Sequence, residues 1–124
     1  MIPQRIVPAR YGDTRGWFTE SYNKLALAAL GIDCDFVQDN HSFSEARGTL
    51  RGIHFQSPPH AQAKLVRCLA GAIWDVAVDL RAGSPTFGRW VAAELTAAGG
   101  EQLFIPVGFG HGFATLTRNA EVAY

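Results

Sequence analysis

Three side chains in this sequence suit proton-transfer chemistry: His54, Lys64 and Tyr124. His54, in the run RGIHFQ, fits a general base because an imidazole titrates near neutral pH, although a half-buried strand histidine held by a neighbour would look the same. Lys64 lies in an apolar run, where it either meets solvent or points inward and stabilises developing negative charge. Tyr124 ends the chain, where a tyrosine is either frayed or, inside a barrel, a proton donor.

A fourth candidate, His111, raises the question of a metal. Its run PVGFGH resembles the second motif of the cupin barrels, in which the histidine can be a metal ligand. The partner motif requires His-x-His, and this chain has Gly52-Ile53-His54 instead. The spacing of His41, His54, His60 and His111 fits no ligand pattern, so we expect no metal site. A metal-dependent cupin enzyme that uses His54 and His111 is kept as an alternative.

The elements that must position these residues are mainly short strands. One helix is predicted from a cap at Ser21 to an end at Gly31, because apolar residues recur there at helical spacing. Strands are predicted at residues 50–56, 63–69, 72–80, 90–96, 102–105, 112–117 and 121–124. Many short strands separated by turn residues favour an all-β barrel or sandwich, of which a jelly roll is one kind.

Alternation along the strands predicts which side chains share a face. Residues 74, 76, 78 and 80 share one face, while Asp75 and Asp79 lie on the other, which must meet solvent or a polar cavity. In the run 50–56, Arg51 is predicted to face away from His54. If His54 and Lys64 point into one barrel, two titratable groups meet in a sheltered space, which is typical of an active site.

Composition limits the classes of function. With 124 residues, 48% hydrophobic, the chain fits one domain with its own core. Eleven basic and eleven acidic side chains give no net charge, which disfavours nucleic-acid binding. No apolar stretch is long enough to span a membrane, and no secretory signal is visible. Cys34 and Cys68 are the two cysteines, so we expect a cytoplasmic protein with reduced thiols.

Several blocks in order along nearly the whole chain resemble the dTDP-4-dehydrorhamnose 3,5-epimerase family. These blocks are RGWF followed by ES near the start, and then FVQDNHS, LRGIHFQ, PPHAQAKLVR, DVAVDLR, SPTFG and IPVGFGHGF. The resemblance implies a cupin-type jelly-roll barrel, a homodimer, and a reaction without cofactor or metal. The implied reaction is epimerisation at carbons 3 and 5 of dTDP-4-dehydro-6-deoxy-D-glucose to dTDP-4-dehydro-L-rhamnose, in dTDP-rhamnose biosynthesis.

The resemblance also implies roles for single residues. His54 would be the base, Tyr124 the proton donor and Lys64 the group that supports the enolate. Phe18 would lie beside the thymine ring. Contacts to the nucleotide and phosphates, some of them across the dimer, would fall on Arg15, Glu20, Gln38, Asn40, Arg51 and His111.

Members of the family continue beyond the position of Tyr124, so residues 1–124 are expected to be a single jelly-roll domain that lacks the family's C-terminal portion. That portion carries the carboxylate that orients the catalytic histidine, a place that Asp75 or Asp79 could take if either points inward. Two alternatives follow: a jelly roll that binds a dTDP-sugar without converting it, and an epimerase that inverts one carbon only.

Overall fold

The structure, a computed structural model, describes residues 1–124, and all but one of its elements are strands. Their order along the chain is β1 (Gln4–Ile6), β2 (Arg10–Asp13), β3 (Gly16–Thr19), α1 (Lys24–Ala29), β4 (His41–Ser44), β5 (Leu50–His54), β6 (Lys64–Ala70), β7 (Ala72–Asp79), β8 (Trp90–Thr96), β9 (Gln102–Ile105), β10 (Phe109–Thr115) and β11 (Ala120–Ala123). The helix α1 has six residues, whereas a membrane-spanning helix needs about 20.

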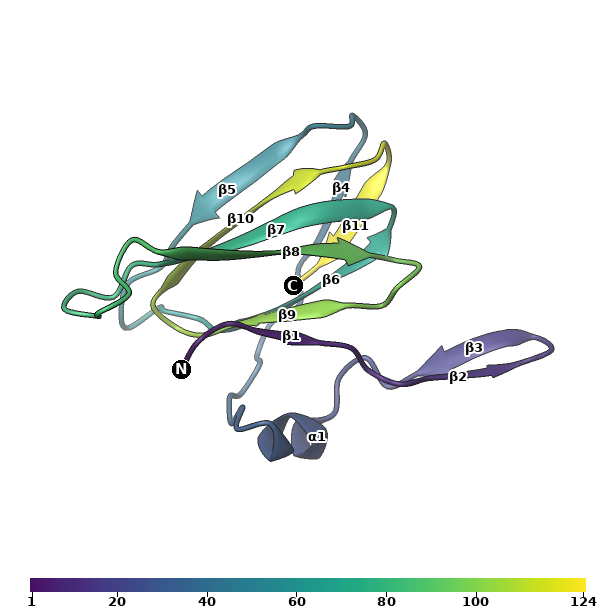
Figure 1. Cartoon of the computed structure of the whole chain (residues 1–124), viewed down its shortest axis with the longest axis horizontal. Coiled ribbons are helices and arrows are strands. Elements are labelled where there is room, and N and C mark those ends of the chain that lie inside the picture. Colours follow the sequence, from purple (N-terminus) through teal and green to yellow (C-terminus); the bar gives the residue numbers. More distant parts are fainter.

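Nine of the strands form two sheets that face each other (Figure 1). One sheet has the order β1-β9-β6-β11-β4, and the other has the order β5-β10-β7-β8. Every pairing is antiparallel, and most neighbours in a sheet are distant in sequence, so the chain passes repeatedly from one sheet to the other. This arrangement is that of a jelly roll. The predicted all-β jelly roll with one short helix is confirmed.

The core lies between the sheets and is built from alternate residues of the strands. The inner face of β7 carries four residues that are at most 1% exposed: Ile73, Asp75, Ala77 and Asp79. Trp74, on the outer face, is 42% exposed. The two predicted faces of this strand are therefore confirmed, and the carboxylates face the interior. From the opposite sheet, Val66 and Cys68 belong to the same buried cluster.

The helix is shorter than predicted and has a different cap. Asn23 precedes α1, and its side-chain oxygen accepts a hydrogen bond from the N–H of Ala26 at 3.0 Å. The prediction of Ser21 as the cap was wrong, because an N-cap must lie within reach of the first free N–H groups. Gly31, at φ +82°, lies just beyond the end of the helix, as expected.

Strands β1 to β4 were not predicted. Each is three or four residues long with at most one buried residue, and none shows a clear alternation of apolar and polar residues. Strand β1 pairs with β9, about one hundred positions further along the chain. A pairing between such distant segments leaves little local signal in the sequence, because the partner strand and not the strand's own residues determines it.

An irregularity in β5 changes which of its side chains share a face. His54 pairs with His111 of β10, and Arg51 pairs with Phe113. Three steps on β5 therefore match two steps on β10, which is a β-bulge. Directly opposed residues of antiparallel strands project to the same side, so Arg51 and His54 share the inner face. The prediction that they face opposite ways was wrong, because a bulge interrupts simple alternation.

Gly52 is the residue that permits this bulge. Its φ is +109°, a value that side chains with a Cβ rarely adopt. A Cβ at Gly52 would lie 2.6 Å from the carbonyl oxygen of His111 and 2.7 Å from Cα of Gly112. The backbones of β5 and β10 thus approach each other more closely than any other residue type would allow.

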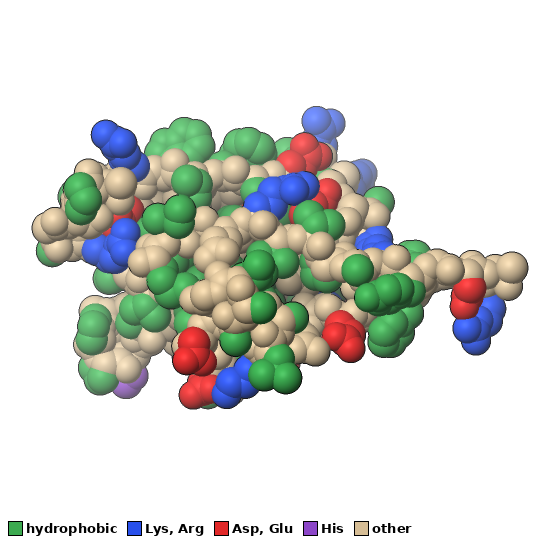
Figure 2. Space-filling view, turned by 60° about the horizontal axis from the view of Figure 1, so that its bottom comes forward, with side chains coloured by type: hydrophobic (Ala, Val, Ile, Leu, Met, Phe, Trp, Pro, Cys, Tyr) green, Lys and Arg blue, Asp and Glu red, His purple; other side chains and the backbone are tan.

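Strands β2 and β3 form a hairpin, residues 10–19, which we call the arm because it projects away from the two sheets (Figures 1 and 2). Arg10 anchors the base of the arm by donating hydrogen bonds to the carbonyl oxygens of Ala98 at 2.7 Å and Ala97 at 2.8 Å. Its guanidinium also lies 3.8 Å from the centre of a Trp17 ring. The arm therefore has a fixed base and an exposed aromatic surface that includes Phe18, 64% exposed.

Candidate functional site

Lys64, Tyr124 and His54 lie at the same end of the two-sheet body, the end away from the β6–β7 turn at Gly71. Lys64 begins β6, and Tyr124 follows β11, which runs antiparallel to β6. His54 ends β5 beside the first residues of β10, which in turn pair with the last residues of β7. The topology thus brings the three residues predicted for catalysis to one end of the barrel from three different strands.

Lys64 is half-buried and makes no hydrogen bond or ion pair, and its Nζ lies 5.6 Å from the centre of the Tyr124 ring. Burial lowers the pKa of Lys64 below its usual value, and the negative charge of Asp75 opposes that effect. The sequence left open whether Lys64 meets solvent or points inward, and the structure favours the inward orientation.

Asp75 and His111 form a buried pair in the middle of the site. Oδ1 of Asp75 lies 2.6 Å from Nε2 of His111, and the two side chains are 0% and 2% exposed. The other oxygen, Oδ2 of Asp75, is buried and has no hydrogen-bond partner. Burial raises the pKa of the Asp75 carboxyl, while the hydrogen bond from His111 lowers it.

The sequence suggests that Asp75 or Asp79 could orient His54 if either points inward. Both point inward, but neither is hydrogen-bonded to His54. Asp75 is bonded to His111. Asp79 accepts hydrogen bonds from the side chains of Arg81, Ser84 and Thr86. Each carboxylate is therefore committed to another partner.

Tyr124 is held firmly although it ends the chain. Its backbone N–H donates to the carbonyl oxygen of Asn40 at 3.0 Å, and its carbonyl oxygen accepts from the N–H of Asn40 at 2.7 Å. Its ring packs in a T-shaped arrangement against two buried rings, with centroid distances of 5.5 Å to His111 and 6.4 Å to Phe113. The phenol ring is therefore held against His111 and Phe113, and the frayed alternative does not apply.

His54 is the least constrained of the three. It is exposed, and its imidazole makes no hydrogen bond within residues 1–124. Its place opposite His111 in the β5–β10 pairing puts it on the inner face. Nothing in this chain fixes which ring nitrogen carries the proton.

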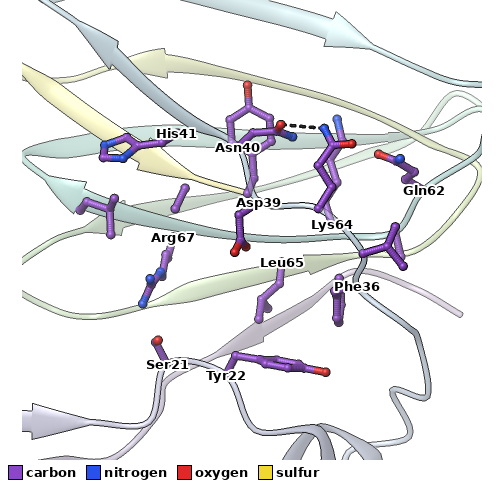
Figure 3. A pocket seen from close by; sticks show the side chains of 16 residues that line it. Ser21, Tyr22, Phe36, Asp39, Asn40, His41, Gln62, Lys64, Leu65 and Arg67 are labelled. Atoms are coloured by element: carbon purple, nitrogen blue, oxygen red, sulfur yellow. Dashed lines mark hydrogen bonds between the residues drawn. The ribbon is translucent and has the colours of Figure 1, made fainter.

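A cavity of about 620 Å³ opens beside Lys64 and Tyr124 (Figure 3). Four of the predicted site residues line it: Gln38, Asn40, Lys64 and Tyr124. Nε2 of Gln38 donates to Oδ1 of Asn40 at 2.8 Å. Figure 3 shows Lys64 beside this hydrogen bond. The other six predicted residues do not line it; of these, His54, Arg51 and His111 lie on β5 and β10.

The cavity also has polar lining residues that were not among the predicted site residues, among them His41, Gln62 and Arg67. Arg67 alternates with the buried Val66 and Cys68, so it lines the cavity from the outer face of β6, opposite to Lys64. Arg67 and Gln62 lie in the run PPHAQAKLVR, so their closeness in sequence to Lys64 was the signal that could have found them. His41 gave no such signal, because it reaches the cavity through the pairing of β4 with β11.

Arg51 lies between the two sheets rather than free in a cavity. Its Nε donates to Oγ of Ser44 at 3.0 Å, and its Nη2 donates to the carbonyl oxygen of Phe43 at 2.8 Å. The guanidinium therefore links β5 to β4 across the gap between sheets, and Nη1 is left without a partner in this structure.

The remaining predicted contacts are Arg15 and Phe18 on the arm, which projects away from the two sheets (Figure 1), and Glu20 at its base, next to Ser21 of the cavity lining. Arg15, with an 89% exposed side chain, is paired with Asp13 near the tip of the arm at 2.6 Å. Phe18 is on β3. Glu20 follows β3 and accepts a hydrogen bond from Asn23 at 3.0 Å.

No group of three or more His, Cys, Asp or Glu side chains that could hold a metal ion occurs in residues 1–124. His54 and His111, which the metal-dependent alternative would use, are paired across β5 and β10. Nε2 of His111 is already engaged by Asp75.

An antiparallel jelly roll with an ionisable cluster at one end defines a cupin-type protein whose barrel end can receive a small polar ligand. Comparison with known proteins then gives the particular family. The sequence profile described as dTDP-4-dehydrorhamnose 3,5-epimerase matches residues 4–124. The chain belongs to this family.

Individual relatives agree with the profile. The dTDP-4-dehydrorhamnose 3,5-epimerase of Sinorhizobium fredii is 50% identical over 119 residues, which are 96% of this chain and 61% of the relative. A crystal structure of the Bacillus anthracis enzyme with TDP and PPi bound superposes with a TM-score of 0.95 at 50% identity, covering 98% of this chain and 69% of that one. The Legionella pneumophila enzyme, solved in complex with dTDP-4-keto-L-rhamnose, gives 0.92 at 48% identity, covering 98% and 64%.

The chain thus spans about two thirds of the length of these relatives.

Proposed function

We propose that this protein epimerises carbons 3 and 5 of dTDP-4-dehydro-6-deoxy-D-glucose, giving dTDP-4-dehydro-L-rhamnose for dTDP-rhamnose biosynthesis. The observation that carries the proposal is the meeting of Lys64, Tyr124 and His54 at one end of the barrel, in a chain of this epimerase family. The molecules bound by the two relatives, TDP and a dTDP-ketosugar, support the substrate class.

The chemistry follows from the ketone at carbon 4. A ketone acidifies the C–H bonds on both flanking carbons, because the carbanion formed spreads onto oxygen as an enolate. In our proposal, neutral His54 removes a proton from one face and Tyr124 returns one from the other face. General acid–base catalysis of this kind contributes roughly 10²–10⁴-fold in rate.

Lys64 has the role of stabilising the enolate oxygen. Its ammonium group is half-buried and has no partner within the protein, so its N–H donors are free for a ligand. Loss of one such contact typically costs about 2.7–4 kcal/mol of activation free energy.

The nucleotide diphosphate would be held by the remaining polar residues of the site. We assign this role to Gln38 and Asn40, which line the cavity, and to Arg51 and His111, which lie on the inner face near His54. Arginine suits a diphosphate because its planar fork donates two parallel hydrogen bonds.

We further propose that the protein is a homodimer in which the arm of one copy contributes to the site of the other. Arg15 and Phe18 project away from the cavity of their own chain, so they can approach a substrate only from a second copy. Glu20, at the base of the arm, would act with them. The exposed aromatic residues of the arm are an apolar surface suited to such a contact.

For the location we propose the cytoplasm. Cys34 and Cys68 are both free thiols, as is usual in a reducing compartment.

The proposal is tested by incubating the protein with the dTDP-ketosugar in deuterated water and following both flanking carbons by NMR. Wild-type protein should incorporate deuterium at carbons 3 and 5. His54→Ala and Tyr124→Phe should lose incorporation while keeping the fold, and His60→Ala, in an exposed loop, should behave as wild type. Normal incorporation by His54→Ala would overturn the assignment of the base.

The same measurement separates the proposal from the non-catalytic alternative. If the protein binds TDP by calorimetry and yet no deuterium enters at either carbon, it is a binding module. Incorporation at one carbon alone would identify an epimerase for that carbon.

A further inference from the structure

Two complementary groups in the site lack a partner in the folded chain. The half-buried ammonium of Lys64 makes no hydrogen bond or ion pair, and Oδ2 of Asp75 is buried without a hydrogen bond. Burying a charge without a counter-charge is costly, so the two groups are expected to depend on each other although they do not touch.

The geometry explains why they stay apart. Oδ1 of Asp75 is held by His111 at 2.6 Å, and both side chains are at most 2% exposed, so the carboxylate has no room to swing toward Lys64. The Tyr124 ring lies against His111 at 5.5 Å, and Nζ of Lys64 lies 5.6 Å from that same ring. Asp75, His111, Tyr124 and Lys64 therefore form a continuous series of contacts.

We propose that Asp75, fixed by His111, is a positioning residue that supplies the negative charge needed to keep Lys64 as an ammonium ion while leaving all its N–H donors free for the substrate oxygen. A direct ion pair would also keep Lys64 charged, but it would occupy the donors. Because Asp75 does not touch Lys64, its negative charge favours the ammonium form without occupying the N–H donors that the substrate oxygen needs.

The other titratable groups around Lys64 do not supply this negative charge. His111 of β10 and Tyr124 at the chain end lie on its side of the sheet. The other titratable residues that line the neighbouring cavity are Tyr22, Asp39, His41 and Arg67, of which Arg67 points to the opposite face of β6. Asp39 is the one other carboxylate among them, and it is exposed, so water screens it. The downward effect of burial on the pKa of Lys64 is opposed by Asp75 alone among charged groups.

The sequence allows a direct measurement, because Lys24 and Lys64 are the only two lysines. Reductive ¹³C-methylation gives one NMR signal for each lysine and one for the N-terminal amine, and each signal can be followed through a pH titration. Asp75→Asn keeps the size of the side chain and an acceptor for His111 but removes the charge. Asp79→Asn is the matched control, since it removes a buried carboxylate from the same face of the same strand.

In Asp75→Asn, the pKa of Lys64 should fall while that of Lys24, which is paired with Asp35 at the surface, stays in place. In Asp79→Asn, both should stay in place. An unchanged Lys64 titration in Asp75→Asn, or an equal fall in Asp79→Asn, would overturn the inference. If Asp75→Asn does not fold, the wild-type Lys64 signal should still show a second step as the Asp75 carboxyl takes up a proton, and a single-step curve would overturn the inference.

The role of Lys64 toward substrate rests on the proposed function, and a second readout tests that part separately. The basic limb of the pH profile for deuterium incorporation should move to lower pH in Asp75→Asn, because Lys64 then loses its proton earlier. If the NMR titration shows the coupling but no variant incorporates deuterium, the proposed function fails and the electrostatic coupling stands. A profile that does not move in an active Asp75→Asn variant would contradict the positioning role.

Discussion

Asp75 and Asp79 are the same residue type on the same face of β7, and both are almost completely buried, yet they do different things. Asp75 has one hydrogen-bonded oxygen and one free oxygen. Asp79 is surrounded by donors from Arg81, Ser84 and Thr86, which join the end of β7 to the loop that follows it. At the scale of the residue, partners rather than burial separate a site carboxylate from a structural one.

The hydrogen bonds from Arg81, followed by those from Thr86 and Ser84, hold the pKa of Asp79 far below its usual value. A lowered pKa stabilises the fold above the pKa of the unfolded carboxyl, about 3.9, and that contribution is lost as the pH falls toward the lower folded value. Asp79→Asn should therefore reduce the free energy of unfolding markedly near neutral pH.

The difference between wild type and Asp79→Asn should shrink as the pH drops below about 4. Urea unfolding at several pH values measures it. Asp35→Asn is the control, since Asp35 pairs with Lys24 on the surface and should change the stability little at any pH. A difference that is constant across the pH range would show that the Asp79 charge is not what stabilises the loop.

At the scale of the element, the pairing of β5 with β10 decides whether His54 and Arg51 share a face. Gly52 is the critical residue, and Gly52→Ala should destabilise the protein for two reasons. Its positive φ costs roughly 1–2 kcal/mol with a Cβ present, and forcing a methyl group against the backbone of β10 adds typically about 1–3 kcal/mol.

Gly83→Ala isolates the first of these costs. Gly83 has φ +77°, but a Cβ there would meet no atom within 4 Å. Thermal unfolding of both variants should show the larger loss for Gly52→Ala, and hydrogen exchange should show weakened protection of β5 in that variant. Equal losses in the two variants would mean that the close approach of β5 and β10 does not matter.

The sequence predicted the strands that carry the core but not the details of their pairing. The alternation in β7 placed Trp74 outside and Asp75 inside correctly, because one face of that strand is entirely buried. The bulge in β5 could not be predicted in this way, since it depends on β10, which lies more than fifty positions away. For the same reason the sequence singled out His111 but not its bond to Asp75.

At the scale of the whole molecule, the arm is the feature that a single chain leaves unexplained. It carries exposed aromatic residues into solvent, and monomeric proteins rarely expose such surface without a use. If the arm contacts a second copy, Phe18→Glu should shift the protein toward monomer in sedimentation velocity, because a charge would be buried in the interface.

Phe87→Glu is the matched control, since Phe87 is similarly exposed, at 60% against 64%, but lies in the loop between β7 and β8. It should leave the sedimentation coefficient unchanged. A Phe18→Glu variant that sediments as wild type does would remove the arm from the interface, and equal effects of both variants would point to general destabilisation.

The contacts of Arg10 at the base of the arm indicate which neighbouring positions can be substituted among homologues. Its two hydrogen bonds are accepted by main-chain oxygens, so substitutions of the side chains at Ala97 and Ala98 would leave both bonds in place. Gly100 is different, because a methyl group there would lie 2.7 Å from Nε of Arg10. Among homologues that keep the arm in this direction, we expect the two alanine positions to diverge and the glycine to persist together with its arginine.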